Sequence, residues 1–334
     1  MTAPTAPTAP ATYTIALEEH FALPEILERT SHVSGPQSDA AAAATRPMLL
    51  DLGDQRLAAM DAAGVDLQVL SHTAPGLEHV PGGDAPALAR AANDAVLDAV
   101  ARHPTRFAGF ATLAVGDPAA AAEELQRTAG LGLRGALVNG MVQGRFLDHP
   151  SFDDLLGVAE QLDVPLYVHP GVPPPEVVRA YYAGFSDDVT RALSTVAWGW
   201  HAETAVHVLR LVLAGVFDRH PRLQVVIGHM GETLPVMLDR ASSLLSPMSG
   251  LQRPVRDYLT SHVHLTIAGV YSQPAFLAAL QTWGSDRLMY STDFPYVPGA
   301  AAAKFLADVQ LSPADRRRFA AGNAAALLKL ELLA

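Results

Sequence analysis

The sequence contains no cysteine and very few lysines, and both absences restrict its chemistry. Without cysteine the chain forms no disulfide and offers no thiol nucleophile or thiolate ligand, so any metal site must use histidine, aspartate and glutamate. The 23 basic residues, only two of them lysine, stand against 34 acidic ones and leave a net charge of −11. Because this charge repels phosphate backbones and anionic lipid, we expect neither nucleic acid nor membranes as partners.

Long apolar runs are also missing. No run approaches the roughly 20 residues that a membrane span requires. The opening residues, MTAPTAPTAPAT, lack the basic region and the apolar core of a signal peptide. We therefore expect a disordered tail over residues 1–12, a single domain over residues 13–334 and a cytoplasmic protein. Hydrophobic residues make up 49% of the chain, which is enough for a large core.

Short β-rich runs alternate with longer amphipathic stretches along the rest of the chain. The expected strands are residues 13–17, 66–70, 106–113, 135–139, 165–169, 224–228, 262–268 and 287–291. The expected helices are residues 51–63, 86–103, 118–129, 151–162, 202–217, 233–245, 273–283 and 300–308. This alternation predicts an α/β fold of the (β/α)8 barrel type. The alternative, an open doubly wound sheet, is disfavoured because no glycine-rich phosphate-binding motif follows the first strand.

Two connections are longer than ordinary barrel loops, residues 21–50 and residues 171–200. Both leave the C-terminal end of a strand, which is where active sites of such barrels lie. We therefore interpret them as pocket walls or lids. Residues 312–330 are expected to form two closing helices.

Polar side chains follow several of the predicted strands directly. Glu18, Glu19 and His20 come after the first strand, His169 ends the fifth, and Asp293 comes just after the eighth. In a parallel barrel these ends share one face, and the alternation of side chains directs Glu18 and His20 to the same side, with Glu19 opposite. Two carboxylates and two imidazoles meeting there form a ligand set suited to one divalent ion.

A second pair of polar residues follows the sixth predicted strand. His229 comes directly after this strand, and Glu232 comes three residues later. We expect Glu232 in the first turn of the next helix, where the helix dipole favours a carboxylate and where it orients His229. The other histidines, including His201 and His207 on a predicted helix, are interpreted as structural.

Several segments together resemble the amidohydrolase-related decarboxylases, in particular the γ-resorcylate and 2,3-dihydroxybenzoate decarboxylase group. They are LEEHFALPE, MDAAGVDLQVL, YVHP, WGWHAETAVHVLRLVLAGVFDRHPRL, GHMGE and YSTDFPY. The resemblance extends over nearly the whole chain after the tail. Other amidohydrolases open with a His-x-His pair, whereas Glu18-Glu19-His20 has the Glu-x-His form typical of the decarboxylase branch.

The resemblance implies an amidohydrolase-type barrel with one divalent ion, manganese, magnesium or zinc, and no organic cofactor. The ligands would be Glu18, His20, His169 and Asp293. The implied reaction is a reversible, non-oxidative decarboxylation of a small aromatic acid, an ortho-hydroxylated benzoate such as γ-resorcylate or 2,3-dihydroxybenzoate. Asp293 would move a proton to the ring carbon that bears the carboxylate, with His229 and Glu232 as a positioning or proton-relay pair.

The resemblance also implies a homodimer or homotetramer in which Arg240 reaches the pocket of a neighbouring subunit. It implies that Thr73 and Ala74, after the second strand, line the pocket for the substrate ring. In the same loop the sequence departs from the family, because relatives usually carry an apolar residue and a glutamine where this chain has His72 and Glu78. Such an ionisable group would either bind a further hydroxyl of the substrate or face solvent.

Two other functions remain open. A metal-dependent hydrolase of the same superfamily would use His229 to activate water and open a lactone, ester or amide. Glu18 in place of a histidine argues against it only weakly, because it changes the charge of the metal site but not its capacity to bind water. A barrel that binds aromatic acids without turnover is the other alternative, and the complete set of ligands argues against it.

Overall fold

The computed structural model describes residues 12–34, 39–80 and 82–332. Each strand pairs in parallel with its neighbours. The strands form two arcs of one barrel, β1-β2-β3 and β4-β5-β6-β7-β8-β9. A bridge between Glu19 and Phe294 closes the ring, with the amide of His20 donating to the carbonyl of Phe294 at 2.7 Å. The strands are β1 (Ile15–Phe21), β2 (Leu67–His72), β3 (Phe107–Gly109), β4 (Ala111–Thr112), β5 (Ala136–Asn139), β6 (Leu166–His169), β7 (Val225–Ile227), β8 (Val263–Thr266) and β9 (Leu288–Met289).

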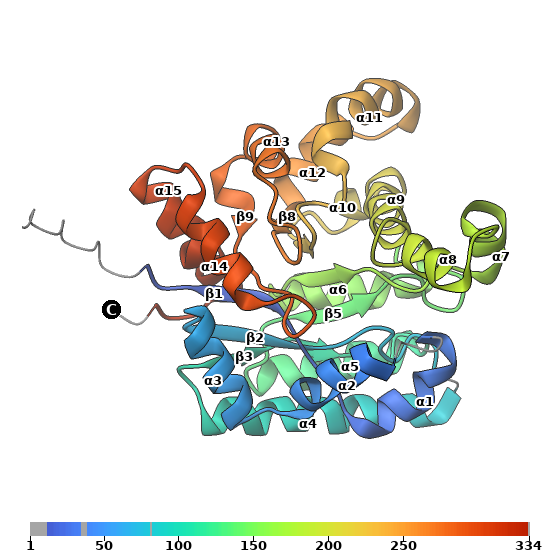
Figure 1. Cartoon of the computed structure of the whole chain (residues 1–334). Helices are drawn as coiled ribbons and strands as arrows, with labels where there is room; N and C mark the ends of the chain where they lie inside the picture. The colour runs from blue at the N-terminus through green and yellow to red at the C-terminus, as the bar shows by residue number, and fades with distance from the viewer. Residues whose placement is uncertain (1–11, 35–38, 81, 333–334) are drawn as a thin grey trace, which may run out of the picture.

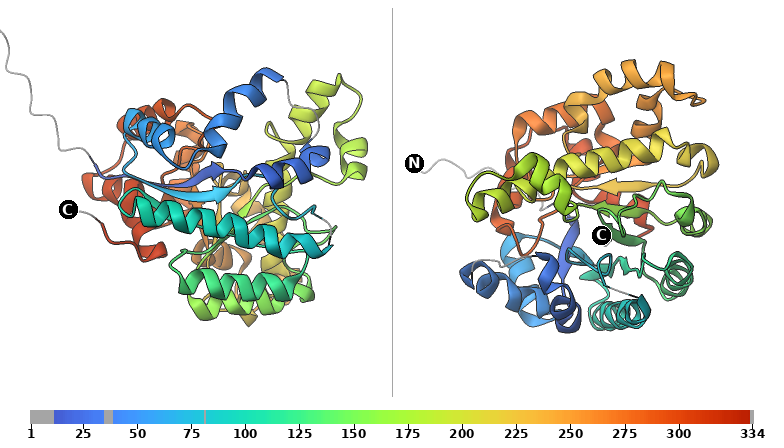
Figure 2. Two further views of the ribbon diagram at one scale, coloured as in Figure 1. Left: turned by 90° about the horizontal axis from the view of Figure 1, so that it is seen from below. Right: turned by 90° about the vertical axis from the view of Figure 1, so that its right-hand side faces the viewer.

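The predicted barrel and each of its predicted strands are confirmed, with β3 and β4 as halves of one expected strand interrupted at Phe110. Helices surround the strands (Figures 1 and 2). They include α3 (Asp54–Ala63), α4 (Ala85–Arg102), α5 (Pro118–Gly130), α6 (Asp153–Leu162), α9 (Gly199–Leu213), α10 (Val216–Arg219), α11 (Leu234–Ser249), α12 (Val255–His262), α13 (Gln273–Trp283) and α14 (Gly299–Asp308). Each predicted helix is present, but residues 202–217 are divided between α9 and α10. The division falls at Gly215, which has a left-handed backbone with φ of 67°.

Both long connections contain helices that the sequence pattern did not indicate. The first holds α1 (Pro24–Ser34) and α2 (Asp39–Leu50), and the second holds α7 (Pro175–Val177) and α8 (Asp187–Ser194). α1, α7 and α8 gather at one end of the barrel (Figure 1). The closing helices are confirmed as α15 (Pro313–Arg317) and α16 (Asn323–Leu328). Residues 1–11 of the expected tail lie outside the described residues, and no described helix is long and apolar enough to cross a membrane.

Apolar side chains form one core inside the barrel and another between the barrel and its helices. The outer core packs the outward-facing side chains of the strands against the surrounding helices. The inner core includes the fully buried Tyr167 and is closed at one end by residues of α16. Its members on the barrel wall are Ile15, Leu17, Leu67, Val69, Ala108, Phe110, Leu137, Tyr167, Val226 and Met289.

Strand β1 contains a bulge. Its pairing with β2 shifts register between Ala16 and Glu19, with one more residue on β1 than on β2. As a consequence Leu17 and Glu18 both face the barrel interior, Leu17 in the inner core and Glu18 against Tyr167. A bulge of this kind redirects a side chain, and here it turns a carboxylate toward the centre of the barrel.

Candidate metal centre and active site

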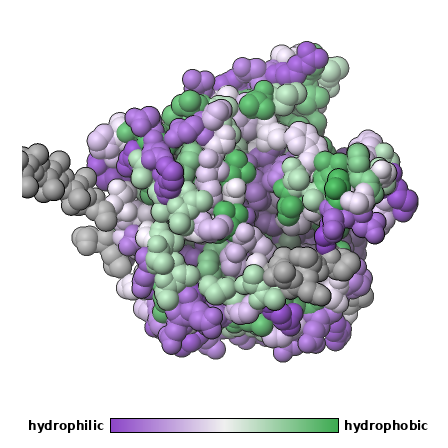
Figure 3. Space-filling model, viewed as in Figure 1, coloured by the Kyte–Doolittle hydropathy of each residue, from purple (hydrophilic) through white to green (hydrophobic). Residues whose placement is uncertain are grey.

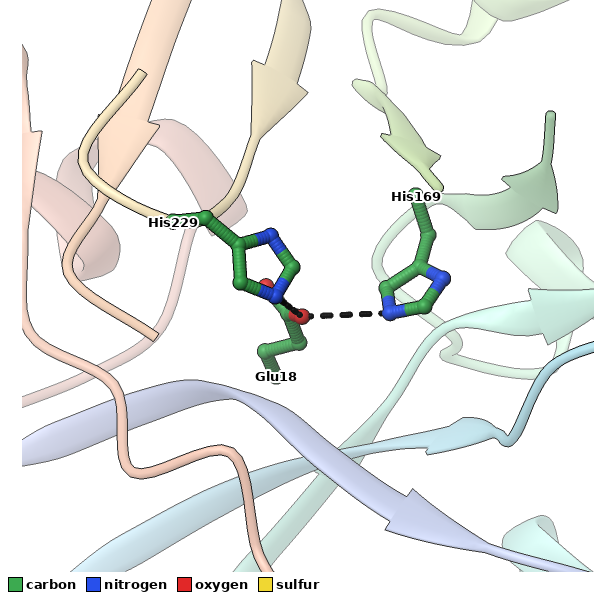
Figure 4. A group of neighbouring side chains, drawn as sticks. All are labelled: Glu18, His169 and His229. Atoms are coloured by element: carbon green, nitrogen blue, oxygen red, sulfur yellow. Dashed lines mark ion pairs between the residues drawn. The ribbon is translucent and has the colours of Figure 1, made fainter. Parts of the chain in front are cut away.

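The carboxylate of Glu18 lies among three imidazoles, two of which are drawn in Figure 4. Its Oε1 atom is 3.2 Å from Nε2 of His169, 3.5 Å from Nε2 of His229 and 3.9 Å from Nε2 of His20. This oxygen is buried and has no hydrogen-bond partner among the described residues, whereas Oε2 accepts from the hydroxyl of Tyr167. Gly228 permits the close approach, since a Cβ there would lie 2.4 Å from Oε2 of Glu18.

Asp293 completes this group from the loop after β9. Its Oδ1 atom lies 3.5 Å from Nε2 of His20, and its backbone is left-handed with φ of 59°. Gly269 packs against it, and a Cβ at that glycine would lie 2.9 Å from Oδ2 of Asp293. The structure therefore brings Glu18, His20, His169 and Asp293 together at one end of the barrel.

The donor atoms of this group suit a divalent ion. His169 donates from Nδ1 to the carbonyl of Pro170 at 2.8 Å, which leaves the lone pair of Nε2 directed toward Glu18. Nitrogen and oxygen ligands about 2.0–2.2 Å from one ion lie roughly 3–3.5 Å apart, close to the spacing of these side chains. An unpartnered carboxylate oxygen beside imidazole nitrogens is the donor set that zinc or manganese prefers.

The carboxylates and imidazoles of this group change one another's pKa. Burial opposes ionisation of Glu18, but His229, His169 and His20 outweigh it and hold the pKa of this carboxyl well below its usual range. Burial likewise opposes protonation of His20, yet Asp293 and Glu18 raise the pKa of its imidazole to about 9. The site thus stabilises positive charge, as a cation site must.

The backbone after β7 differs from the prediction. Residues 229–233 all have positive φ, and α11 begins only at Leu234, so Glu232 is not in the first turn of a helix. The prediction that a helix dipole stabilises this carboxylate is therefore wrong. Glu232 is fully buried and accepts from Nδ1 of His229 at 2.7 Å and from Nδ1 of His201 at 2.5 Å. Two imidazoles hold its charge, and they lower its pKa against the opposing effect of burial.

Sequence reasoning missed two residues of this site. His201 was interpreted as structural, but it lies at the start of α9 and binds Glu232. Its position directly after the long insertion was the available signal. Tyr167 was not singled out, although alternation along β6 places it on the same side as His169, and its hydroxyl reaches both Glu18 and Thr266.

The loop after β2 also reaches the site. The hydroxyls of Thr73 and Tyr296 are hydrogen-bonded at 2.6 Å, and the ring of Tyr296 lies 5.6 Å from that of His20. Ala74 is the next residue and is partly exposed. This placement agrees with a role in lining a pocket, which remains a prediction.

His72 does not face solvent, and its contacts are structural. Its side chain is buried, with Nε2 accepting from the amide of Leu23 at 3.2 Å and Nδ1 donating to the carbonyl of Thr73 at 2.9 Å. Burial lowers the pKa of His72 to about 4, so the ring is neutral at pH 7. It connects the loop after β2 to the start of the first insertion.

Glu78 is also buried rather than exposed. Its Oε1 atom accepts from the amide of Asn139 at 2.7 Å, and burial raises the pKa of Glu78 to about 7. The side-chain Oδ1 of Asn139 is buried and has no hydrogen-bond partner among the described residues. The side-chain Nδ2 of Asn139 lies 3.4 Å from both oxygens of Glu78, and burial disfavours the charge of this carboxyl.

Replacing Glu78 with glutamine is expected to stabilise the protein at alkaline pH. The pKa of Glu78 is raised from 4.5 to about 7, so the folded protein binds more protons than the unfolded chain between these values, and stability falls as pH rises through them. Glutamine carries no charge, and its amide oxygen can still accept from the backbone amide of Asn139. We expect E78Q to raise the free energy of unfolding by about 2–3 kcal/mol at pH 8 and far less at pH 5, measured by urea unfolding.

The exposed Glu123 on α5 provides the control, because E123Q should change stability little at either pH. Equal stabilisation by E78Q at pH 5 and pH 8 would show that ionisation of Glu78 plays no part.

Arg240 is not brought to this group. It lies on the exposed surface of α11, and within the described ranges no contact joins its side chain to the residues above. Its predicted role depends on a neighbouring subunit.

Comparison with known proteins agrees with this geometry. The profile of the amidohydrolase family matches residues 20–330. A γ-resorcylate decarboxylase from Rhizobium sp. is 38% identical over 331 residues, covering 95% of this chain and 98% of the relative. The chain therefore belongs to the amidohydrolase family, as the sequence segments indicated.

Solved structures show the same relationship. That of 2,6-dihydroxybenzoate decarboxylase complexed with 2,6-dihydroxybenzoate has a TM-score of 0.87 and 37% identity, covering 96% of this chain and all of the other. A dihydroxybenzoic acid decarboxylase from Polaromonas sp., with bound manganese and the inhibitor 2-nitroresorcinol, has a TM-score of 0.87 and 35% identity, with coverage of 96% and 98%.

Proposed function

We propose that this protein is a metal-dependent, non-oxidative decarboxylase of an ortho-hydroxylated benzoate, and that residues 13–334 form its single catalytic domain. The observation that carries the proposal is the buried, unpartnered Oε1 of Glu18, which lies 3.2–3.9 Å from three imidazole nitrogens. The decarboxylase relatives that match nearly the whole chain support the reaction class. The proposed ligands of one manganese, magnesium or zinc ion are Glu18, His20, His169 and Asp293.

The ion, when bound, would act as a Lewis acid that stabilises negative charge on the substrate carboxylate and the adjacent phenol oxygen. The protein has to supply a proton to the ring carbon that bears the carboxylate. Asp293 lies beside His20 with its side chain 13% exposed. We infer that it holds and transfers this proton. Once the carbon is protonated, the electron pair of the carbon–carboxylate bond returns to the ring and carbon dioxide leaves.

The geometry of His229 supports a role in this transfer. Its Nδ1 is bound by Glu232, so its Nε2 is directed toward Glu18 and the centre of the site. This arrangement fixes the orientation of the ring and leaves one nitrogen to exchange a proton with a substrate hydroxyl or with Asp293. We infer that His229 and Glu232 act as the proton-relay pair.

The test is an assay of carbon dioxide release by protein of measured metal content. The substrates are 2,6-dihydroxybenzoate, 2,3-dihydroxybenzoate, salicylate and 5-carboxyvanillate, with chelator-treated protein as the control. We expect metal-dependent release from at least one of them. No release by metal-loaded protein, together with hydrolysis in a panel of aromatic esters and lactones, would overturn the proposal in favour of the hydrolase.

We also propose that α11 forms a contact between subunits of a homodimer or homotetramer. Its exposed surface carries large apolar side chains around Arg240, and hydrophobic side chains are visible along α11 in Figure 3. The largest exposed fractions there belong to Met248 at 76%, Val236 at 70%, Met237 at 50% and Leu244 at 49%. A clustered apolar surface of this kind is typical of a protein interface.

Replacing Arg240 with alanine is expected to raise KM for the substrate by about 10–100-fold. A charge-assisted hydrogen bond to the substrate carboxylate contributes about 1.5–3 kcal/mol, and its loss weakens binding by this factor. Steady-state kinetics and light scattering check activity and subunit number together. Arg222, exposed on the loop before β7, provides the matched control R222A. A KM for R240A equal to that of R222A would contradict a role for Arg240 at the partner's pocket.

A further inference from the structure

We propose that His201 is a positioning residue for proton transfer, because its hydrogen bond to Glu232 fixes the orientation of His229. This inference rests on the decarboxylase function proposed above and extends it to the residue directly after the insertion that follows β6. His201 lies in the first turn of α9, which begins at Gly199 at the end of that insertion.

The carboxylate of Glu232 joins the two imidazoles. Its Oε2 atom accepts from Nδ1 of His201 at 2.5 Å, and its Oε1 atom accepts from Nδ1 of His229 at 2.7 Å. The two rings lie 4.8 Å apart at an angle of 63°. Since both oxygens are occupied and Glu232 is fully buried, the carboxylate has one favourable orientation.

His201 itself is held from the other side. Its Nε2 lies 3.1 Å from the carbonyl oxygen of Val196, at the end of the insertion, and its side chain is 16% exposed. The insertion therefore fixes His201, His201 fixes Glu232, and Glu232 fixes the orientation of the His229 ring. With Nδ1 held by Glu232, Nε2 of His229 faces Glu18, 3.5 Å away, and the centre of the site.

Loss of the His201 donor would leave a buried carboxylate oxygen without a partner. Such an oxygen is costly to bury, so Glu232 would rotate or take up a proton, and either change releases His229. Partners of this outer kind contribute about 10–100-fold to activity in comparable sites. The expected effect falls on kcat, because His201 contacts none of the proposed ligands in the described structure.

Three variants of His201 separate a hydrogen-bond donor from mere packing. H201N places an amide N–H close to the position of Nδ1, H201F keeps a ring of similar volume without a donor, and H201Q places its donor farther out. We expect kcat of H201N to stay within about threefold of the wild type and kcat of H201F and H201Q to fall about 10–100-fold. KM and metal content should be unchanged in all three. The exposed His149 supplies the control H149F, which should resemble the wild type.

Nuclear magnetic resonance of histidine-labelled protein loaded with zinc or magnesium tests the same inference without turnover. We expect a downfield Nδ1–H resonance of His229 in the wild type and in H201N, and its loss or displacement in H201F and H201Q. Should H201F retain full kcat and this resonance, or should H201N be as impaired as H201F, the inference is overturned. If the wild type decarboxylates nothing, the proposed function fails, while the resonance still reports whether His201 positions His229.

Discussion

Asparagine in place of Asp293 is expected to lower kcat for decarboxylation by about 10²–10⁴-fold with little change in the free energy of unfolding. Asparagine keeps the shape of the side chain and an oxygen that faces His20. It cannot hold and release the proton that the ring carbon needs, and it removes one negative charge from the proposed ligand set. Carbon dioxide release under saturating substrate, with metal content and urea unfolding measured on the same sample, checks this expectation.

The surface carboxylate Asp308, paired with Lys304, supplies the control D308N. It should leave kcat unchanged, because exposed ion pairs contribute little. Near-normal turnover in D293N with bound metal would remove Asp293 from proton transfer.

Glutamine in place of Glu18 is expected to weaken metal binding by more than about 100-fold, since even the loss of an outer partner of a metal ligand costs about 10–100-fold. The amide still accepts from Tyr167, so the barrel interior keeps its packing. The variant loses the anionic oxygen around which His20, His169 and His229 are arranged. Competition titration of manganese against a chelator measures the change in affinity.

The adjacent carboxylate provides a matched comparison. Glu19 accepts from the backbone amide and hydroxyl of Thr292, from the hydroxyl of Ser291 and from the side-chain Nε2 of Gln68, all on the outer side of the strand. Because Glu19 faces away from the proposed ligands, the folded E19Q protein should retain its metal affinity. If both variants lost metal equally, the division of roles between neighbouring glutamates would be wrong.

The barrel was predictable because each strand and its following helix carry a local pattern that repeats around the fold. The convergence of His169 and Asp293 followed from their places at the ends of predicted strands. Shorter elements escaped prediction for physical reasons. The helix α12 spans only Val255–His262 and begins after Pro254, without a capping side chain that would mark its start.

The details of the site were less predictable. In residues 229–233 only Gly231 is a residue type that favours a left-handed backbone. The other four are His, Met, Glu and Thr, which rarely adopt it, so the sequence does not predict this conformation. The partnership of His201 with Glu232 joins positions 31 residues apart, and His201 is held by the end of an insertion whose path depends on tertiary packing. Burial of Glu78 was also not predictable. The sequence places this charged residue in a loop, and only the fold shows that it is buried and accepts from the backbone amide of Asn139.

The bulge in β1 has a consequence for protein design. In a regular strand, the inward direction of Ile15 and Leu17 would continue at Glu19, and Glu18 and His20 would face the helices. Copying the four proposed ligands onto an idealised barrel would therefore place two of them in the wrong layer. A designed metal centre of this kind would also need the extra residue of β1. The design must therefore copy the bulged strand as well as the four side chains.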